Sequence, residues 1–127
     1  MRRGVLVGVV LAAAMTAGCD RTGTSEHAPG SYKVREAGIA LRGGGPECAA
    51  RPGPTTCPAE LTRLRDGQRL FPVCQQGGQT VGSNPFWLYA IGPRGKRGWV
   101  PSWYLDYPAN RLPGVPDCTA DLLRDRG

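Results

Sequence analysis

The segment GKRGWVPSWYLDY, residues 95–107, carries the most regular pattern in this chain of 127 residues. Gly98 within it has no side chain, so a neighbouring strand can approach closely at that point. The preceding segment FWLYAI, residues 86–91, is rich in aromatic residues, which favour strands. GPRG at residues 92–95 supplies a turn between the two segments. The sequence therefore predicts a β-hairpin here, followed by one tight turn over residues 102–105.

Short apolar stretches separated by glycine and proline continue this pattern on the N-terminal side of the hairpin. Alternating apolar and polar residues predict three further strands, at residues 32–36, 38–44 and 68–76. Pro72 has no N–H for a hydrogen-bond ladder, so it predicts an edge position or a bulge in the third of them. The segments between are predicted as a loop at 44–58, one helical turn or a loop leading into a strand at 59–68, and a turn at 77–85. About five short strands with such turns indicate an all-β fold, a single small barrel.

The strand predicted at residues 86–91 is apolar on both of its faces. Trp87, Tyr89 and Ile91 share one face, and the residues between them share the other. Such a strand fits a barrel whose outer face is partly covered by loops or by a ligand.

The N-terminal residues have the features of an export signal. Arg2 and Arg3 precede an apolar run at residues 4–15, which is shorter than the roughly 20 residues of a membrane-spanning helix. TAGC at residues 16–19 resembles the lipobox of bacterial lipoproteins, in which the signal is cut before the cysteine and the thiol receives a diacylglycerol. The match departs from that pattern at Thr16, where leucine is usual.

A signal peptide over residues 1–18 and a lipid anchor on Cys19 follow from this resemblance, with ordinary secretion as the alternative. Residues 19–31 lack apolar periodicity and are predicted as a flexible tether. The folded domain is then expected at residues 32–118, with a frayed C-terminus at 119–127. We expect the protein outside the cytoplasm, anchored to the outer face of the cytoplasmic membrane.

Four further cysteines lie in the predicted domain, at positions 48, 57, 74 and 118. An even number in a small exported domain predicts two disulfides, and three pairings are open. We favour Cys48–Cys57, which closes a short loop, and Cys74–Cys118, which would tie the C-terminal tail to the domain. In the chain-entropy account these bonds contribute about 2.7 and about 4 kcal/mol to stability. A zinc site is disfavoured because there is no Cys-x-x-Cys pair and the single histidine, His27, lies in the predicted tether.

Composition and charge favour some functions over others. Fourteen of the 16 basic residues are arginine, and glycine, proline and alanine abound, which favours a bacterium of high G+C content such as an actinobacterium. The formal charge is +6, or +4 once Arg2 and Arg3 are removed. This excess suits contact with anionic lipid or wall polymers, although solvated surface charge is the simpler interpretation. We interpret the Arg–Gly stretches at 42–45 and 93–98 as turns and expect no nucleic-acid partner.

Residues suited to catalysis are sparse. The lone histidine lies outside the predicted domain, so no Ser-His-Asp triad is available there. The carboxylates are scattered, and no pair is convincingly spaced for acid–base chemistry. We therefore expect no enzyme, no cofactor and no metal.

The chain resembles the bacterial SH3-like (SH3b) domain family over residues 32–107. The resemblance rests on the closing motif GWVPSWYL at 98–105, and on a preceding strand, an ALRGG segment where the family often shows LNVRSGP, a long variable loop and a further strand ahead of a tryptophan. It implies a small β-barrel. The cysteine-bearing insertion at 44–58 departs from the family's compact loop. A cysteine in the central strand with another in a trailing proline-rich tail is similar to a variant of exported actinobacterial members, which supports Cys74–Cys118.

The candidate ligand contacts are aromatic residues and one proline, namely Trp87, Trp99, Pro101, Trp103 and Tyr104. Pro101 and Tyr104 beside Trp103 resemble the P-x-x-Y turn of eukaryotic SH3 domains, which lines a groove for proline-rich peptides. The simpler interpretation is that these aromatics only close the barrel.

Members of the SH3b family often bind wall peptides or glycans. We therefore predict a non-catalytic binding module of the cell envelope that recognises peptidoglycan, above all its peptide. The alternative is a protein–protein interaction module that docks a proline-rich or extended segment of an envelope protein. A structural role without a ligand is the third hypothesis.

Overall fold

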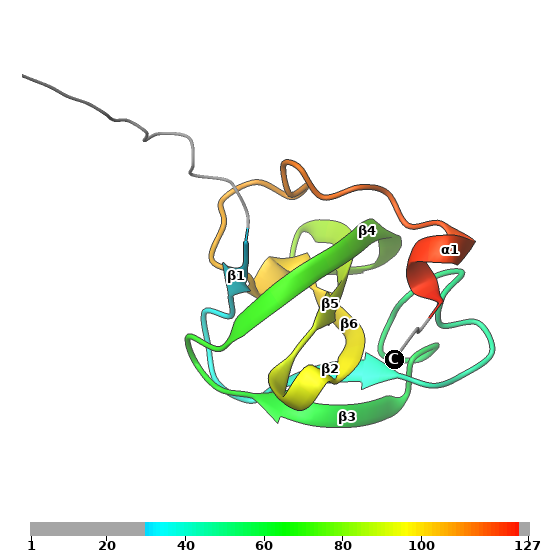
Figure 1. Cartoon of the computed structure of the whole chain (residues 1–127), viewed down its shortest axis with the longest axis horizontal. Helices are drawn as coiled ribbons and strands as arrows, with labels where there is room; N and C mark the ends of the chain where they lie inside the picture. The colour runs from blue at the N-terminus through cyan, green and yellow to red at the C-terminus, as the bar shows by residue number, and fades with distance from the viewer. Residues whose placement is uncertain (1–29, 125–127) are drawn as a thin grey trace, which may run out of the picture.

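The structure, a computed structural model of the chain, describes residues 30–124. These residues form one antiparallel sheet that curls into a half-barrel, with strand order β1-β4-β5-β6-β2-β3 (Figure 1). The strands are β1 (Tyr32–Lys33), β2 (Ile39–Gly43), β3 (Ala59–Leu64), β4 (Arg69–Val81), β5 (Asn84–Ile91) and β6 (Arg97–Pro101). Three short helical segments accompany them, η2 (Pro93–Gly95), η3 (Ser102–Tyr104) and α1 (Ala120–Leu123). The predicted all-β fold is confirmed, with six strands where the sequence indicated about five.

The predicted hairpin is formed by β5 and β6, which pair from Trp87 opposite Pro101 to Ile91 opposite Arg97. The turn between the two strands is η2, and the tight turn that follows β6 is η3. β2 pairs with the other edge of β6. Gly98 permits this approach, because a Cβ there would lie 2.8 Å from the Leu41 side chain.

β4 is the longest strand, and it confirms one expectation and corrects another. The register against β5 shifts between Pro72 and Cys74, so the bulge predicted from the proline is present. The turn predicted at 77–85 is present but shorter than expected, because β4 runs on to Val81 and only two residues separate it from β5. Gly78 keeps this part of β4 in contact with the loop beneath it, since a Cβ there would lie 2.2 Å from the carbonyl oxygen of Pro52.

Residues 59–64 form β3, so the helical turn considered for this segment is wrong. β3 pairs with β2 from Ile39 opposite Leu64 onward and lies at the edge of the sheet (Figure 1). Most of its side chains are exposed, and Leu64 is the one buried member. Glu60 and Arg63 place charge along this strand, a common protection of an open sheet edge.

The sheet carries a hydrophobic core on each face. The inner core lies inside the half-barrel and includes Leu88 and Ala90 of β5 and Val100 of β6. The outer core contains Trp87 and Trp99, which neighbour those residues along the same strands and so point to the opposite face. The predicted division of faces along β5 is therefore confirmed.

The outer core is partly covered by other segments of the chain. Cys48 and Cys57 belong to it, and the loop that carries them lies over β4 and β5. Leu123 of α1 packs against the same cluster, and α1 lies beside that loop in Figure 1. Thr119 caps this helix by accepting a hydrogen bond from the backbone N–H of Leu122 at 3.2 Å. Within the end that was expected to be frayed, residues 120–123 form this helix, and residues 125–127 lie outside the described part.

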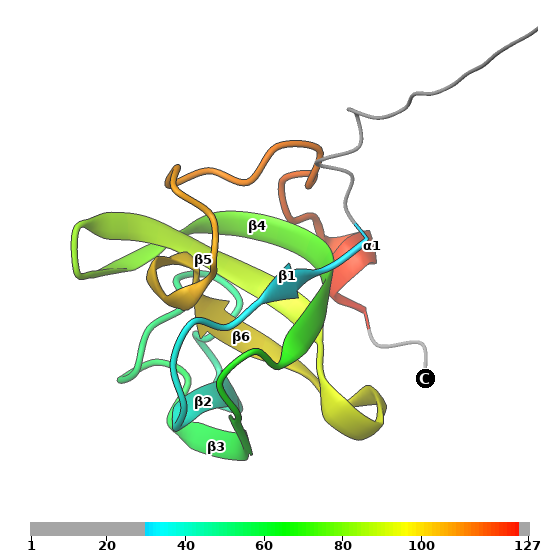
Figure 2. The same ribbon diagram turned by 90° about the vertical axis from the view of Figure 1, so that its left-hand side faces the viewer.

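The segment between η3 and α1 crosses over β4 as an extended strap, which Figure 2 shows above the sheet. Gln75, which is fully buried in β4, holds this strap in place. Its side-chain Nε2 donates to the carbonyl oxygens of Leu112 (2.8 Å) and Val115 (2.9 Å), and its Oε1 accepts from the N–H of Leu112 at 2.9 Å. The Gln75 backbone also bonds Pro116 and Cys118.

Both favoured disulfides, Cys48–Cys57 and Cys74–Cys118, are present. Two disulfides in a domain this small indicate that it folds in an oxidising, extracytoplasmic compartment. Within residues 30–124, no helix has the length and apolar character needed to cross a bilayer. The predicted signal peptide, Cys19 and nearly all of the predicted tether lie outside the described residues.

Candidate functional site

Two of the five candidate contact residues, Trp87 and Trp99, lie in the outer core. Their side chains are 0% and 3% exposed. The indole N–H of Trp87 donates to the carbonyl oxygen of Gln79 at 2.7 Å, and the Trp99 ring lies 5.0 Å from the ring of Tyr89. Both rings are therefore packed into the fold, although Trp87 also borders the first hollow described below and Trp99 borders a separate open hollow of about 250 Å³.

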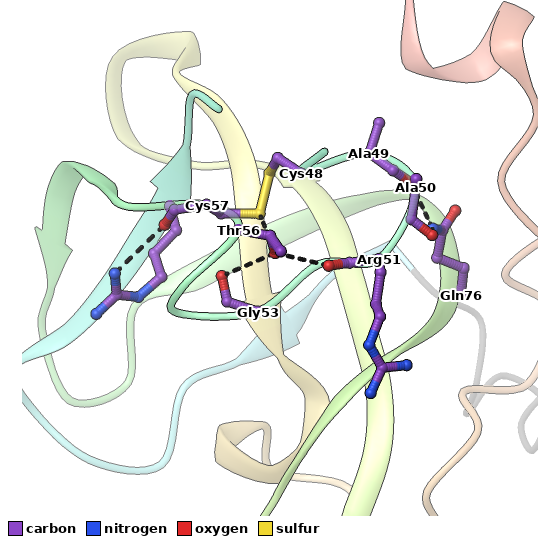
Figure 3. Close-up of a disulfide and its surroundings, with 9 residues drawn as sticks. Cys48, Ala49, Ala50, Arg51, Gly53, Thr56, Cys57 and Gln76 are labelled. Atoms are coloured by element: carbon purple, nitrogen blue, oxygen red, sulfur yellow. Dashed lines mark hydrogen bonds between the residues drawn. A yellow bond between two sulfur atoms is a disulfide. The ribbon is translucent and has the colours of Figure 1, made fainter. Parts of the chain in front are cut away.

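The disulfide loop that covers these two tryptophans is itself held by hydrogen bonds (Figure 3). Thr56 Oγ1 donates to the carbonyl oxygen of Arg51 at 2.6 Å, which closes the loop on itself. Gln76 of β4 donates to the carbonyl oxygen of Ala49 at 2.6 Å, and Arg42 of β2 donates to that of Cys57 at 3.3 Å. The loop is thus fixed to strands on two sides of the sheet.

Pro101 and Tyr104 lie together on the wall of an open hollow of about 200 Å³, here called the Tyr104 hollow. Its other walls are formed by β2 and β3, by Pro54 of the disulfide loop, by the last residue of β4 and by Trp87 of β5. The lining residues are Gly38, Ile39, Ala40, Arg42, Pro54, Glu60, Arg63, Val81, Trp87, Pro101 and Tyr104. Three of the five predicted contact residues, Trp87, Pro101 and Tyr104, therefore line one hollow.

The Tyr104 hollow carries a small excess of positive charge. Glu60 lies between two arginines, 3.6 Å from Arg42 and 2.8 Å from Arg63, measured between the closest N and O atoms. Arg63 also donates to the carbonyl oxygen of Gly38 at 2.8 Å, which fixes its position on the rim. With two cations against one anion, the hollow attracts carboxylates more than ammonium groups.

Trp103, the fifth candidate, faces a different hollow of about 130 Å³ on the other side of η3. Its side chain is 36% exposed, and the Arg35 guanidinium lies 4.9 Å from its ring centroid. Gly82 lies against the ring, because a Cβ there would come within 2.3 Å of it. The lining residues of this second hollow are Arg35, Asn84, Ser102, Trp103, Tyr107, Pro108, Ala109 and Asn110.

The pKa of Tyr32 is shifted by its surroundings, and this residue lies in the inner core and not in either hollow. Burial raises the pKa of the Tyr32 hydroxyl above its usual value of about 10, and the nearby Tyr107 raises it further. The two rings meet edge to face at 5.8 Å. In the part of the chain that the structure describes, no cluster of three or more His, Cys, Asp or Glu side chains is placed to hold a metal ion.

Sequence reasoning missed the charged and polar members of both hollows, among them Arg35, Arg63 and Ser102. The arginines resemble every other arginine of this arginine-rich chain until β2 and β3 pair and bring Arg63 to the rim. Ser102 stands inside the P-x-x-Y turn, but the turn motif directs attention to its proline and tyrosine.

Comparisons of this chain with known protein families, with curated proteins and with solved structures return no match.

Proposed function

We propose that this protein is a non-catalytic binding module of the bacterial cell envelope that recognises peptidoglycan through its peptide. The observation that carries the proposal is the Tyr104 hollow, where Pro101 and Tyr104 form an apolar wall beside an arginine-rich rim. The two disulfides support a location where wall peptides are present. The resemblance to bacterial SH3-like domains supports the same class of ligand.

A wall peptide suits this hollow for chemical reasons. It is an extended chain of small side chains that also carries free carboxylates. The apolar wall at Pro101 and Tyr104 can pack against its methyl groups, while Arg42 and Arg63 attract the carboxylates. Glu60 is shared between the two arginines, so it helps to hold them in position and still leaves one positive charge in excess.

The alternative ligand is a proline-rich or extended segment of another envelope protein. The juxtaposition of Pro101 and Tyr104 on one wall favours it, since such residues pack against polyproline helices. A polyproline groove also needs further exposed aromatic walls. Trp99 is buried and Trp103 faces the other hollow, so this arrangement supports the alternative less than the wall peptide.

Attachment to the membrane through Cys19 is part of the proposal. A diacyl anchor would hold the domain next to the wall, because each buried methylene contributes about 0.8 kcal/mol to retention. Replacement of Cys19 by alanine should release the protein from the membrane fraction into the medium. Membrane retention that is unchanged in Cys19→Ala would contradict the anchor and leave the domain's function open to the next test.

Co-sedimentation of the exported protein with purified wall sacculi tests the function directly. We expect retention that falls in Tyr104→Ala and in Arg63→Gln. The matched controls are Phe71→Ala, which removes another exposed aromatic side chain, and Arg65→Gln, which removes an equal charge two residues away. Neither control residue lines the hollow, so both should leave retention unchanged.

Salt separates the two ligands. Retention through arginine and carboxylate should weaken between low and moderate ionic strength, whereas docking of proline on an aromatic ring should not. Absence of retention at low salt would contradict wall recognition. Binding of a proline-rich peptide that is insensitive to salt and lost in Tyr104→Ala would instead establish the alternative.

A further inference from the structure

The hollow on the other side of η3, here called the Ser102 hollow, contains an unsatisfied polar atom. Ser102 is 3% exposed, and its Oγ is buried without a hydrogen-bond partner among the residues that the structure describes. A buried hydroxyl in this state costs about 1–3 kcal/mol relative to a satisfied one. Ser102 is one of the residues that line an open hollow of the protein.

Arg35 is held in place at the mouth of the same hollow. Its backbone N–H donates to the carbonyl oxygen of Tyr104 at 2.9 Å. Its Nε and Nη2 donate to the carbonyl oxygen of Trp103 at 2.9 and 2.5 Å, and its guanidinium lies over the Trp103 ring. A guanidinium has five N–H donors, and these two bonds use two of them, which leaves three.

The charge of Arg35 has no counterpart in the hollow. No aspartate or glutamate lines it, and within residues 30–124 no carboxylate forms an ion pair with this arginine. Asn84 and Asn110 supply further polar wall, and they are bonded to each other across it at 3.3 Å. A fixed guanidinium with free N–H donors and an unpartnered hydroxyl in the same lining are groups that can bind a carboxylate.

The size of the Ser102 hollow also exceeds what a single solvent molecule requires. The hollow encloses about 130 Å³. One ordered water occupies roughly 10–15 Å³ of such space. The hollow therefore has room for a carboxylate and the small residue that carries it.

We propose that the Ser102 hollow binds the free carboxylate at the end of a peptide chain, with Arg35 and the Ser102 hydroxyl as its donors. Trp103 then acts as the support that fixes Arg35 and as an apolar wall for the last side chain. The choice of a wall peptide as the source of this carboxylate rests on the proposed function. The carboxylate chemistry itself rests only on the contacts described here.

The test is a chemical-shift titration of the isotope-labelled exported protein with N-acetyl-D-alanyl-D-alanine. The same dipeptide with its carboxylate amidated is the second probe, and sodium acetate is the third. We expect saturable shifts at the Ser102 and Trp103 amides with the free acid and none with the amide. Ser102→Ala should weaken the binding about tenfold, since it removes one hydrogen bond to a charged group. Ser83→Ala, which alters an exposed serine at the turn between β4 and β5, should leave the binding unchanged.

A second readout separates a binding role of Ser102 from a structural one. Because its hydroxyl has no partner in the fold, Ser102→Ala should unfold at the same denaturant concentration as the unaltered protein, or at a higher one. Weaker carboxylate binding without loss of stability is therefore the signature of the proposal. Equal binding of the amide, or unchanged binding in Ser102→Ala, would overturn it.

The remaining outcomes identify the source of the carboxylate. Acetate that binds as tightly as the dipeptide would show that the hollow holds small anions and would overturn the assignment to a peptide end. Sacculi retained by the protein without any carboxylate-dependent shift would overturn this inference and leave the proposed function standing. Carboxylate-dependent shifts without retention of sacculi would support this inference and contradict the proposed function.

Discussion

Replacement of Gln75 by leucine is the most direct test of how the C-terminal strap is held. The side chain is fully buried and makes three hydrogen bonds to the strap, two from Nε2 and one to Oε1. Leucine has a similar volume but no polar atoms, so the Leu112 N–H and the Val115 carbonyl would lose this partner, and the Leu112 carbonyl would keep only the bond from the Val115 N–H at 3.5 Å. Leu112 and Val115, which carry these groups, are themselves buried.

The expected cost follows from those three groups. Each buried group that loses its partner costs about 1–3 kcal/mol, and part of this is recovered if the strap moves and admits water. We therefore expect Gln75→Leu to lower the free energy of unfolding by about 3–5 kcal/mol, a large part of the roughly 5–15 kcal/mol typical of a small domain.

The measurement is equilibrium unfolding in denaturant, followed by tryptophan fluorescence with the disulfides intact. Gln76→Leu is the matched control, because the neighbouring glutamine donates to exposed carbonyls of the disulfide loop that water can satisfy instead. It should cost less than about 1 kcal/mol. A loss in Gln75→Leu no larger than that of Gln76→Leu would refute the account of the strap.

Two further predictions test the packing around η3 and the inner core. Gly82→Ala should lower the free energy of unfolding by at least about 1 kcal/mol more than Gly95→Ala does, and it should increase the quenching of Trp103 fluorescence. Both glycines have positive φ, but only at Gly82 would a Cβ meet a ring. Equal losses would contradict the contact. Tyr32 favours its neutral form in the folded state, so its contribution to stability is complete below pH about 10 and is lost as the pH rises through the raised pKa of the fold. Unfolding measured at increasing alkaline pH should show this loss, and the loss should be smaller in Tyr32→Phe; an identical pH dependence in the two proteins would exclude Tyr32 as its origin.

The central hairpin was predictable because its local signals agree with its tertiary environment. β5 is apolar on both faces, and the structure gives each face a core to pack against. The bulge at Pro72 was equally accessible, since the missing N–H of proline acts wherever the strand lies.

The errors fall where tertiary contacts decide the local structure. Leu61 and Leu64 are three residues apart, which matches a helical turn, yet β3 is an edge strand whose exposed residues need not alternate. Gly77 and Gly78 have the composition of a turn, but in the fold Gly78 is the residue that lets β4 pass close to Pro52. The position of β3 at the sheet edge depends on its pairing with β2, and the approach of Gly78 to Pro52 depends on the disulfide loop, so neither can be read from the local sequence.

The candidate site was predictable only for the residues within the turn motif. Pro101 and Tyr104 share a surface because they are near in sequence and η3 turns between them. Arg35 and Ser102 are 67 positions apart in the sequence, and they line one hollow because Val34 pairs with Leu105 across an isolated bridge. No local pattern marks a pair of that kind.

β5 is buried between two cores, one on each face of the sheet, and this limits how its sequence can change during evolution. Successive residues of β5 serve alternate cores, so this strand has no side on which substitutions are neutral. β3 offers the opposite condition, because Leu64 is the only one of its six residues that is buried. Among descendants of this chain, β3 and the Tyr104 hollow that it borders are therefore free to acquire new specificities while β5 stays constrained.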